Sequence, residues 1–323
     1  MPRRPISLVP HAGLALISLA LATFSCQRGP ETAGGERFSG ALADSLVDRQ
    51  LAFGPRVPGT EAHAEALAWL TGYLEARADS VETIAFTHVT TRSDTLELTN
   101  VFARFRPAEP ARILLVAHWD SRPVAERSAD PAARRQPVPG ANDGASGVAV
   151  LLALADLFAR EPPPLGVDIL LTDGEDWGHD PVTLETLGED MLLGARHFAR
   201  TRGETYRPLY GILLDLVGSP DPVFARDGIS LQYAPEVVSR VWVVAAELGY
   251  GDIFVDRIGG ATDDHLPLNE AGIRTIDIID SAFLGEPPWH TTEDTADKIS
   301  ARTLGIVGEV VLEVIRRQGA GGF

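Results

Sequence analysis

The sequence is poor in cysteine, since Cys26 is the only one among its 323 residues. A single cysteine cannot form a disulfide within the chain, so the folded domain depends on its apolar core and on any metal that it binds. The sequence also lacks internal repeats and low-complexity tracts. These absences argue against a disulfide-stapled scaffold, a solenoid and a largely disordered chain.

Positive charge is also in short supply. Lys and Arg together number 28 against 45 Asp and Glu, which gives a formal net charge of −17 and a pI of about 4.8. Nucleic-acid binding depends on basic side chains that neutralise phosphates, so this balance argues against a nucleic-acid partner. The composition, 45% hydrophobic and 23% charged, is that of a globular protein with a large core.

No apolar run in the sequence is long enough for a comfortable membrane span. The apolar stretch 12–24 follows a short basic segment, which is the layout of an export signal. It ends at Ser25-Cys26, which resembles the lipobox of bacterial lipoproteins except that Thr23 stands where Leu is usual. We therefore expect residues 1–26 to be a signal peptide, and the protein to be exported to the periplasm or outer envelope with a lipid anchor on Cys26. Ordinary cleavage followed by secretion is the alternative.

Residues 27–39 are rich in Gly and polar side chains and are expected to form a tether. Residues 40–323 alternate between strand-like and helical patterns, which predicts a single α/β domain. We expect a central mixed, mostly parallel sheet with helices on both faces. The expected strands are 82–90, 97–106, 112–118, 166–173, 209–218 and 272–280, and the expected helices are 41–53, 60–77, 147–160, 189–200, 234–249 and 300–317.

Acidic residues and histidines follow successive strands of this predicted sheet. In open parallel sheets, ligands bind beyond the carboxyl ends of the strands, so these side chains are expected to meet. Any one of them alone is equally well explained as a solvated charge, but that explanation does not account for the recurrence. Asp143, Asp176 and His290 lie on three different loops and are suitable zinc ligands, which favours a metal site.

The neighbouring carboxylates Glu175 and Asp176 point in opposite directions if the segment is extended. One can then bind metal while the other faces the substrate as a general base or acid. If Asp215 and Asp263 converge on Glu175, the like charges raise at least one pKa and the carboxylates share protons.

Six motifs, in this order and with this spacing, resemble the zinc aminopeptidase and glutaminyl cyclase superfamily. The resemblance extends over nearly all of residues 40–318 and implies a zinc aminopeptidase-like fold. It also implies an enzyme that acts on the N-termini of peptides or proteins. The motifs are HWDS (118–121), GANDGASG (140–147), TDGED (172–176), LLDLVG (213–218), GGATDDHLPL (259–268) and WHTTED (289–294).

Two branches of this superfamily fit the residues. The aminopeptidase branch implies two zinc ions and the cyclase branch implies one. A cyclase converts N-terminal Gln to pyroglutamate and releases ammonia, whereas an aminopeptidase hydrolyses the first peptide bond. The aminopeptidase ligands would be His118, Asp143, Asp176, Asp215 and His290. The cyclase would bind zinc through Asp143, Asp176 and His290, with Glu175 as acid/base, Asp215 and Asp263 sharing its proton, and Trp289 as a wall of the substrate pocket.

Three segments favour the cyclase branch: LLDLVGSPDP, SAFLGEPPWHT, and GGATDDH with Asp263 where aminopeptidases commonly have Ser. Two departures concern animal cyclases, which have Glu at the position of Asp176 and His at that of Asp277. A catalytically silent binding lipoprotein on the same fold is a third possibility. The intact set of ligands and Glu175 argues against it.

Overall fold

The computed structural model describes residues 1–2, 35–179, 188–202 and 204–323. Most of the predicted signal peptide and tether, including Cys26, lies outside the described residues. The segment Gly35–Phe323 forms one compact unit. It begins before residue 40, because Phe38 packs against the apolar core and Ser39 caps the first helix.

A six-stranded sheet forms the centre of this unit, with the strand order β1-β2-β4-β3-β5-β8. The strands β3, β4, β5 and β8 run parallel to one another, while β1 and β2 are antiparallel and lie at one edge. This confirms the prediction of a mixed, mostly parallel sheet. The strands are β1 (Ser80–Val89), β2 (Thr95–Phe105), β3 (Arg112–His118), β4 (Gly166–Thr172), β5 (Tyr210–Asp215) and β8 (Thr275–Ile279).

Helices cover both faces of the sheet, as expected. Ile113, Leu115 and Ala117 of β3 pack into the larger part of the core, whereas Leu114 and Val116 face the other way. The larger core is built with α1 (Gly40–Leu51), α2 (Glu61–Glu75), α3 (Ala145–Arg160), α6 (Pro235–Glu247) and α8 (Ala301–Gly319). The opposite face is covered by α4 (Leu193–Arg202) and α7 (His265–Glu270).

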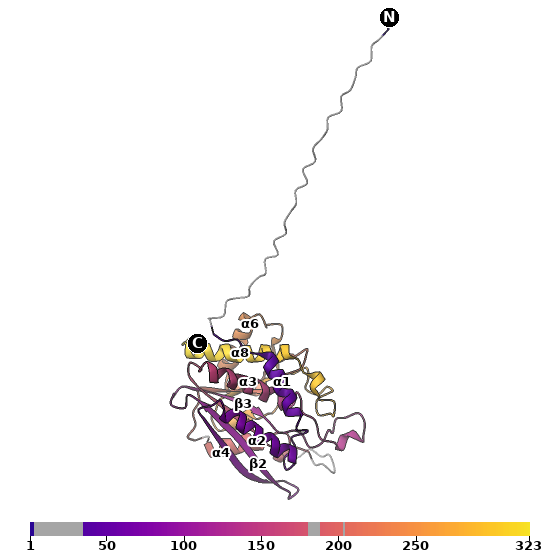
Figure 1. Cartoon of the computed structure of the whole chain (residues 1–323), viewed down its shortest axis with the longest axis vertical. Helices are drawn as coiled ribbons and strands as arrows, with labels where there is room; N and C mark the ends of the chain where they lie inside the picture. Colours follow the sequence, from indigo (N-terminus) through magenta and orange to yellow (C-terminus); the bar gives the residue numbers. More distant parts are fainter. Residues whose placement is uncertain (3–34, 180–187, 203) are drawn as a thin grey trace. The chain divides into compact units, whose positions relative to one another are not determined.

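Helix α3 is the most deeply buried helix of the larger core. Thirteen of its sixteen residues are buried, because it lies between the sheet and the helices α1 and α8 (Figure 1). A helix that is apolar on nearly every side is typical of such a central position. Its first turn directly follows Asp143, so the packing of α3 fixes the place of a predicted metal ligand.

Several elements are shorter than predicted or were not predicted. The fifth strand ends at Asp215, because Leu216 adopts a left-handed conformation with φ 53° that breaks the extended chain. The short pair of parallel strands β6 (Phe224–Asp227) and β7 (Phe254–Gly259), and the helices α5 (Gly228–Tyr233) and α7, are too brief to give a periodic signal. Three short 3₁₀ helices span Ala133–Arg135, Gly188–Asp190 and Ala296–Lys298. In the described parts of the chain, no helix has the length and apolarity needed to cross a membrane.

The contact between α3 and the sheet leaves no room for a side chain at Gly147. A Cβ atom at this position would lie 2.1 Å from the main-chain oxygen of Leu214. We predict that Gly147→Ala lowers the free energy of unfolding by about 3 kcal/mol, the scale of overpacking a rigid core. Gly72→Ala is the matched control, because a Cβ atom in that helix meets nothing within 4 Å. The control should gain about 0.5–1 kcal/mol in urea unfolding.

Candidate active site

Sharp turns at the carboxyl ends of the parallel strands bring the predicted site residues together. His118 and Asp215 are the last residues of β3 and β5, and Glu175 and Asp176 follow the end of β4 after two intervening residues. His290 itself has a left-handed backbone with φ 56°. A non-glycine residue keeps such a conformation only where its surroundings hold it in place, and such residues are often found at functional sites.

Asp143, Asp176 and His290 form a group whose ligand atoms all lie within 4.8 Å of one another. The Nε2 atom of His290 is 3.6 Å from Oδ2 of Asp143 and 3.8 Å from Oδ1 of Asp176. Zinc bonds of about 2.0–2.2 Å place neighbouring tetrahedral ligands about 3.4 Å apart, so the donors stand close to zinc geometry. Oδ2 of Asp176 is buried without a hydrogen-bond partner, as expected for an atom that binds a metal.

His118, Asp143 and Asp215 form a second such group. The Nε2 atom of His118 lies 3.2 Å from Oδ1 of Asp143 and 3.3 Å from Oδ1 of Asp215. Asp143 thus offers one oxygen to each histidine, in the manner of a bridging carboxylate. The structure therefore brings together all five residues that a two-metal centre would use, as well as the three of a one-metal centre.

Two buried aspartates hold the loops that carry these ligands. Asp294 accepts hydrogen bonds from the backbone N–H groups of Asn142 (2.9 Å) and Asp143 (3.0 Å). Asp120 accepts the backbone N–H groups of Glu175 and Asp176, both at 3.2 Å. The sequence placed both aspartates inside motifs, but it gave no sign that they bind the backbone of neighbouring motifs.

Arg122 and Glu126 were not identified from the sequence. Oε1 of Glu126 lies 2.8 Å from Nδ1 of His290, and Oε2 of Glu126 lies 2.8 Å from Nε of Arg122. Arg122 in turn contacts the carboxylate of Asp176. Both residues stand shortly after the HWDS motif, in a loop without periodicity, so only their proximity to that motif could have pointed to them.

The predicted acid/base residues are buried, and the pKa of each is raised above its usual value. Burial raises the pKa of Glu175 well above its ordinary value, and the neighbouring Asp176 and Asp263 raise it further, although His118 opposes them. Burial raises the pKa of Asp215 to about 7, with Asp263 adding to the effect and His118 opposing it. The pKa of Asp263 is raised as well, chiefly by burial. The raised pKa values favour the protonated forms of these carboxyl groups, which suits proton transfer.

One cavity is lined by nearly all of the predicted residues. The ring of Trp289 forms part of its wall, 3.9 Å from the ring of His290 and beneath the guanidinium of Arg127 at 4.7 Å. The predicted residues that line it are Asp143, Glu175, Asp176, Asp215, Asp263, Trp289 and His290, and apolar walls come from Met191, Ala261, Ile279 and Leu284.

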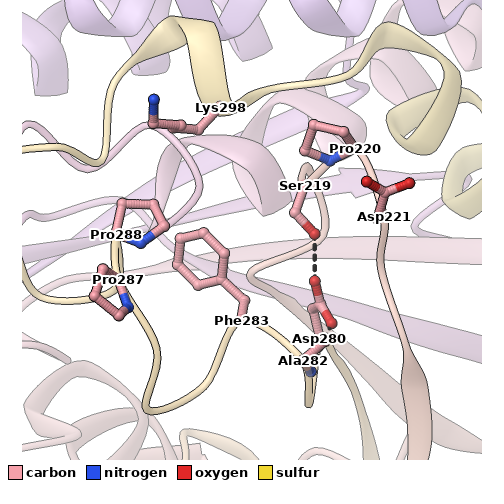
Figure 2. A pocket seen from close by; sticks show the side chains of 9 residues that line it. All are labelled: Ser219, Pro220, Asp221, Asp280, Ala282, Phe283, Pro287, Pro288 and Lys298. Carbon is pink, nitrogen blue, oxygen red and sulfur yellow. Dashed lines mark hydrogen bonds between the residues drawn. The ribbon is translucent and has the colours of Figure 1, made fainter.

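A neighbouring hollow contains none of the candidate ligands. Figure 2 shows the ring of Phe283 and the rings of Pro287 and Pro288 lining it, with Ser219 directed at Asp280. Asp280 is already satisfied, because it also accepts the backbone N–H groups of Val223 and Ala282 at 2.9 Å each. The side chains therefore assign the chemistry to the cavity beside Glu175 and not to this hollow.

Comparison with known proteins places the chain among peptidases and cyclases of one family. The model of peptidase family M28 matches residues 100–315. The crystal structure of a glutaminyl cyclase from Bacteroides thetaiotaomicron, bound to N-acetylhistamine, is 40% identical with a TM-score of 0.83, and the match covers 88% of this chain and 99% of that one. A leucine aminopeptidase precursor from the same organism is 39% identical with a TM-score of 0.84, at the same coverage. A glutaminyl-peptide cyclotransferase of Drosophila melanogaster is 26% identical over 284 residues, which are 77% of this chain and 73% of that protein.

Asp264, beside the candidate site, provides a test of the buried acidity. It belongs to neither group of ligands, its side chain is fully buried, and burial together with the charge of Asp263 raises its pKa to about 8. The folded chain then retains a proton that the unfolded chain loses near pH 4, so Asp264 costs stability as the pH rises from about 4 to 8.

We predict that Asp264→Asn becomes more stable relative to the parent protein by up to about 1.4 kcal/mol per pH unit across this window. Urea unfolding at several pH values between 4 and 8 measures the difference. The exposed Asp48→Asn is the control and should show no such trend. A constant difference between Asp264→Asn and the parent would contradict the buried proton.

Proposed function

The chain belongs to peptidase family M28, and from this premise we propose that it is a zinc-dependent glutaminyl-peptide cyclotransferase. Its reaction would convert N-terminal Gln of peptides to pyroglutamate with release of ammonia. The observation that carries the proposal is Asp263, a buried acid that lines the same cavity as Glu175 without belonging to either ligand group. The similarity to bacterial glutaminyl cyclases over 88% of the chain supports it.

The family implies zinc, and Asp143, Asp176 and His290 are the residues that would hold it. A zinc ion at this place would act as a Lewis acid on the γ-carbonyl of the substrate. Glu175 would remove a proton from the α-amine while the nitrogen attacks the carbonyl carbon of the side-chain carboxamide. The same glutamate would then deliver that proton to the departing amide nitrogen, so one C–N bond forms, another breaks and ammonia leaves.

The electrostatics of the cavity suit this proton transfer. A peptide α-amine has a pKa of about 7.7–8.0, so a base with a pKa raised toward neutrality exchanges protons with it at little cost. Burial and the neighbouring acids Asp176 and Asp263 raise the pKa of Glu175 in that direction. The apolar walls from Ile279, Leu284 and Trp289 would shield the Gln side chain from water.

A two-zinc aminopeptidase is the second candidate, and one observation favours it. His118, Asp143 and Asp215 converge as a second group of possible ligands, which a hydrolase with two metals would use. In that reaction Glu175 would remove a proton from the water molecule that attacks the first peptide bond. The two candidates differ in the nucleophile, because a cyclase uses the substrate's own amine.

We also propose export and a lipid anchor on Cys26, as expected from the basic and apolar segments before it. Membrane fractionation of the full-length protein and of Cys26→Ser tests this anchor. Release of the variant alone from the membrane fraction supports lipidation, and equal release of both proteins overturns it.

A product assay distinguishes the two enzymes directly. We predict that the purified protein converts a Gln-initiated peptide to a product lighter by one ammonia and leaves a Leu-initiated peptide intact, as measured by mass spectrometry. Glu175→Gln should keep its zinc and lose about 10²–10⁴-fold in rate, the scale of general acid–base catalysis. Release of free leucine, with two zinc ions per chain in elemental analysis, would instead identify the aminopeptidase.

The role of Asp263 provides a second test. Asp263→Asn keeps the shape of the side chain but removes a negative charge that raises the pKa of Glu175. We predict normal zinc content, a slower release of ammonia and a pH–rate profile whose acidic limb moves to lower pH. In an aminopeptidase the substitution has no defined catalytic consequence. An unchanged rate and profile would remove Asp263 from the mechanism.

A further inference from the structure

Two side chains outside both ligand groups connect Asp176 to His290. The Nη1 atom of Arg122 contacts Oδ1 of Asp176 and lies 3.3 Å from the main-chain oxygen of the same residue. The Nε atom of Arg122 is 2.8 Å from Oε2 of Glu126, whose Oε1 is 2.8 Å from Nδ1 of His290. Asp176, Arg122, Glu126 and His290 thus form a continuous chain of four residues.

This chain of contacts is shielded from water. The side chain of Arg122 is 1% exposed and that of Glu126 is 11% exposed. Removing an arginine and a glutamate from water costs several kcal/mol per ion, so a buried pair needs partners at both ends. Here Asp176 serves as the second partner of Arg122, and His290 serves as the second partner of Glu126. Removing either member would leave the other, still buried, with one of these two partners fewer.

We propose that Arg122 and Glu126 are positioning residues that together set the zinc affinity of the site, an inference that rests on the proposed zinc site. Their contacts leave one donor atom free on each ligand. Arg122 contacts Oδ1 of Asp176, the oxygen that lies 3.8 Å from Nε2 of His290, and leaves Oδ2 of the same carboxylate buried and without a hydrogen-bond partner. Glu126 holds Nδ1 of His290 as its N–H, which leaves the lone pair of Nε2 directed at Asp143 and Asp176.

Local geometry explains why these two ligands need such support. His290 has a left-handed backbone. Glu126 holds its ring, and its main-chain oxygen accepts a hydrogen bond from the backbone N–H of Arg127 at 3.2 Å. Asp176 has one methylene less than glutamate, so its carboxylate has a shorter reach. The planar guanidinium of Arg122 contacts both the carboxylate and the backbone of Asp176, which fixes that shorter side chain.

The experiment measures the zinc dissociation constant by competition with a chromophoric chelator, without substrate. The parent protein is compared with Glu126→Gln, Arg122→Met and the double variant. Each single change should weaken zinc binding by about 10- to 100-fold, the scale for residues that orient metal ligands. The double variant should lose much less than the product of the two single losses, because both residues act through one chain of contacts.

Two further variants separate positioning from folding. Arg122→Lys keeps the charge without the planar fork and should recover only part of the lost affinity. Arg134→Met is the matched control, because this exposed arginine in the same segment bonds the main-chain oxygen of Ser128 and contacts no candidate ligand. Its zinc affinity should equal that of the parent protein. Circular dichroism of each chelator-treated variant establishes whether the fold is retained. If Glu126→Gln does not fold, the zinc affinity of Arg122→Lys is compared with that of the parent protein instead.

Three outcomes overturn the inference. The first is an unchanged zinc affinity in folded Glu126→Gln and Arg122→Met. The second is a loss of zinc affinity in the double variant that equals the product of the two single losses. The third is a parent protein that binds no zinc. A parent protein that binds zinc with the expected pattern, yet forms no pyroglutamate, overturns the proposed function alone.

Discussion

The burial of many carboxylates at one end of a parallel sheet is the constraint on which the rest of this structure depends. Asp143, Glu175, Asp176, Asp263 and Asp264 are all less than a tenth exposed. Ionised carboxylates cannot all persist there without compensation, since burial penalises the charged form. The fold supplies three kinds of compensation, which are histidines placed to share a metal with the acids, protons retained near neutral pH, and a buried arginine.

Each kind of compensation belongs to a different part of the cluster. Asp143 has its two oxygens directed at His118 and His290, so in the proposed site it is the carboxylate that would bind metal together with both histidines. Asp215 has its pKa raised to about 7, mainly by burial, and keeps its charge only in part near neutral pH. Asp176 is held by Arg122. The proposed site thus combines groups that would bind metal with groups that would carry protons, and both tasks would arise from one excess of negative charge.

The sequence predicted the sheet and most of the site because both depend on local signals. Residues 113–117 (ILLVA) of β3, for example, are all apolar because this strand is covered by helices on both faces. The motif residues recur after strands, and the topology of a parallel sheet brings such positions to one edge. The resemblance of the motifs to a known superfamily then supplied roles that spacing alone could not assign.

Other features depended on contacts that no local pattern carries. Arg122 and Glu126 lie in an irregular loop, and their partners Asp176 and His290 are far away in the sequence. Asp294 holds the backbone of Asp143 from a distance of 151 residues. The early end of β5 follows from the left-handed conformation of Leu216, a residue type that does not usually signal a turn. Tertiary packing decides such features, so only the structure reveals them.

The choice between one metal and two can be expressed as a competition for Asp215. Its carboxylate can complete a metal site with His118 and Asp143, or it can share protons with the acids that line the cavity. It cannot serve fully in both ways, because a metal ligand must be ionised whereas a proton carrier must exchange its proton. Asp263 adds negative charge beside it and raises its pKa, which favours the protonated form. An acid in place of a neutral residue at position 263 thus gives a physical reason why this cluster suits proton transfer from an amine, and it links the proposed cyclase chemistry to a single side chain.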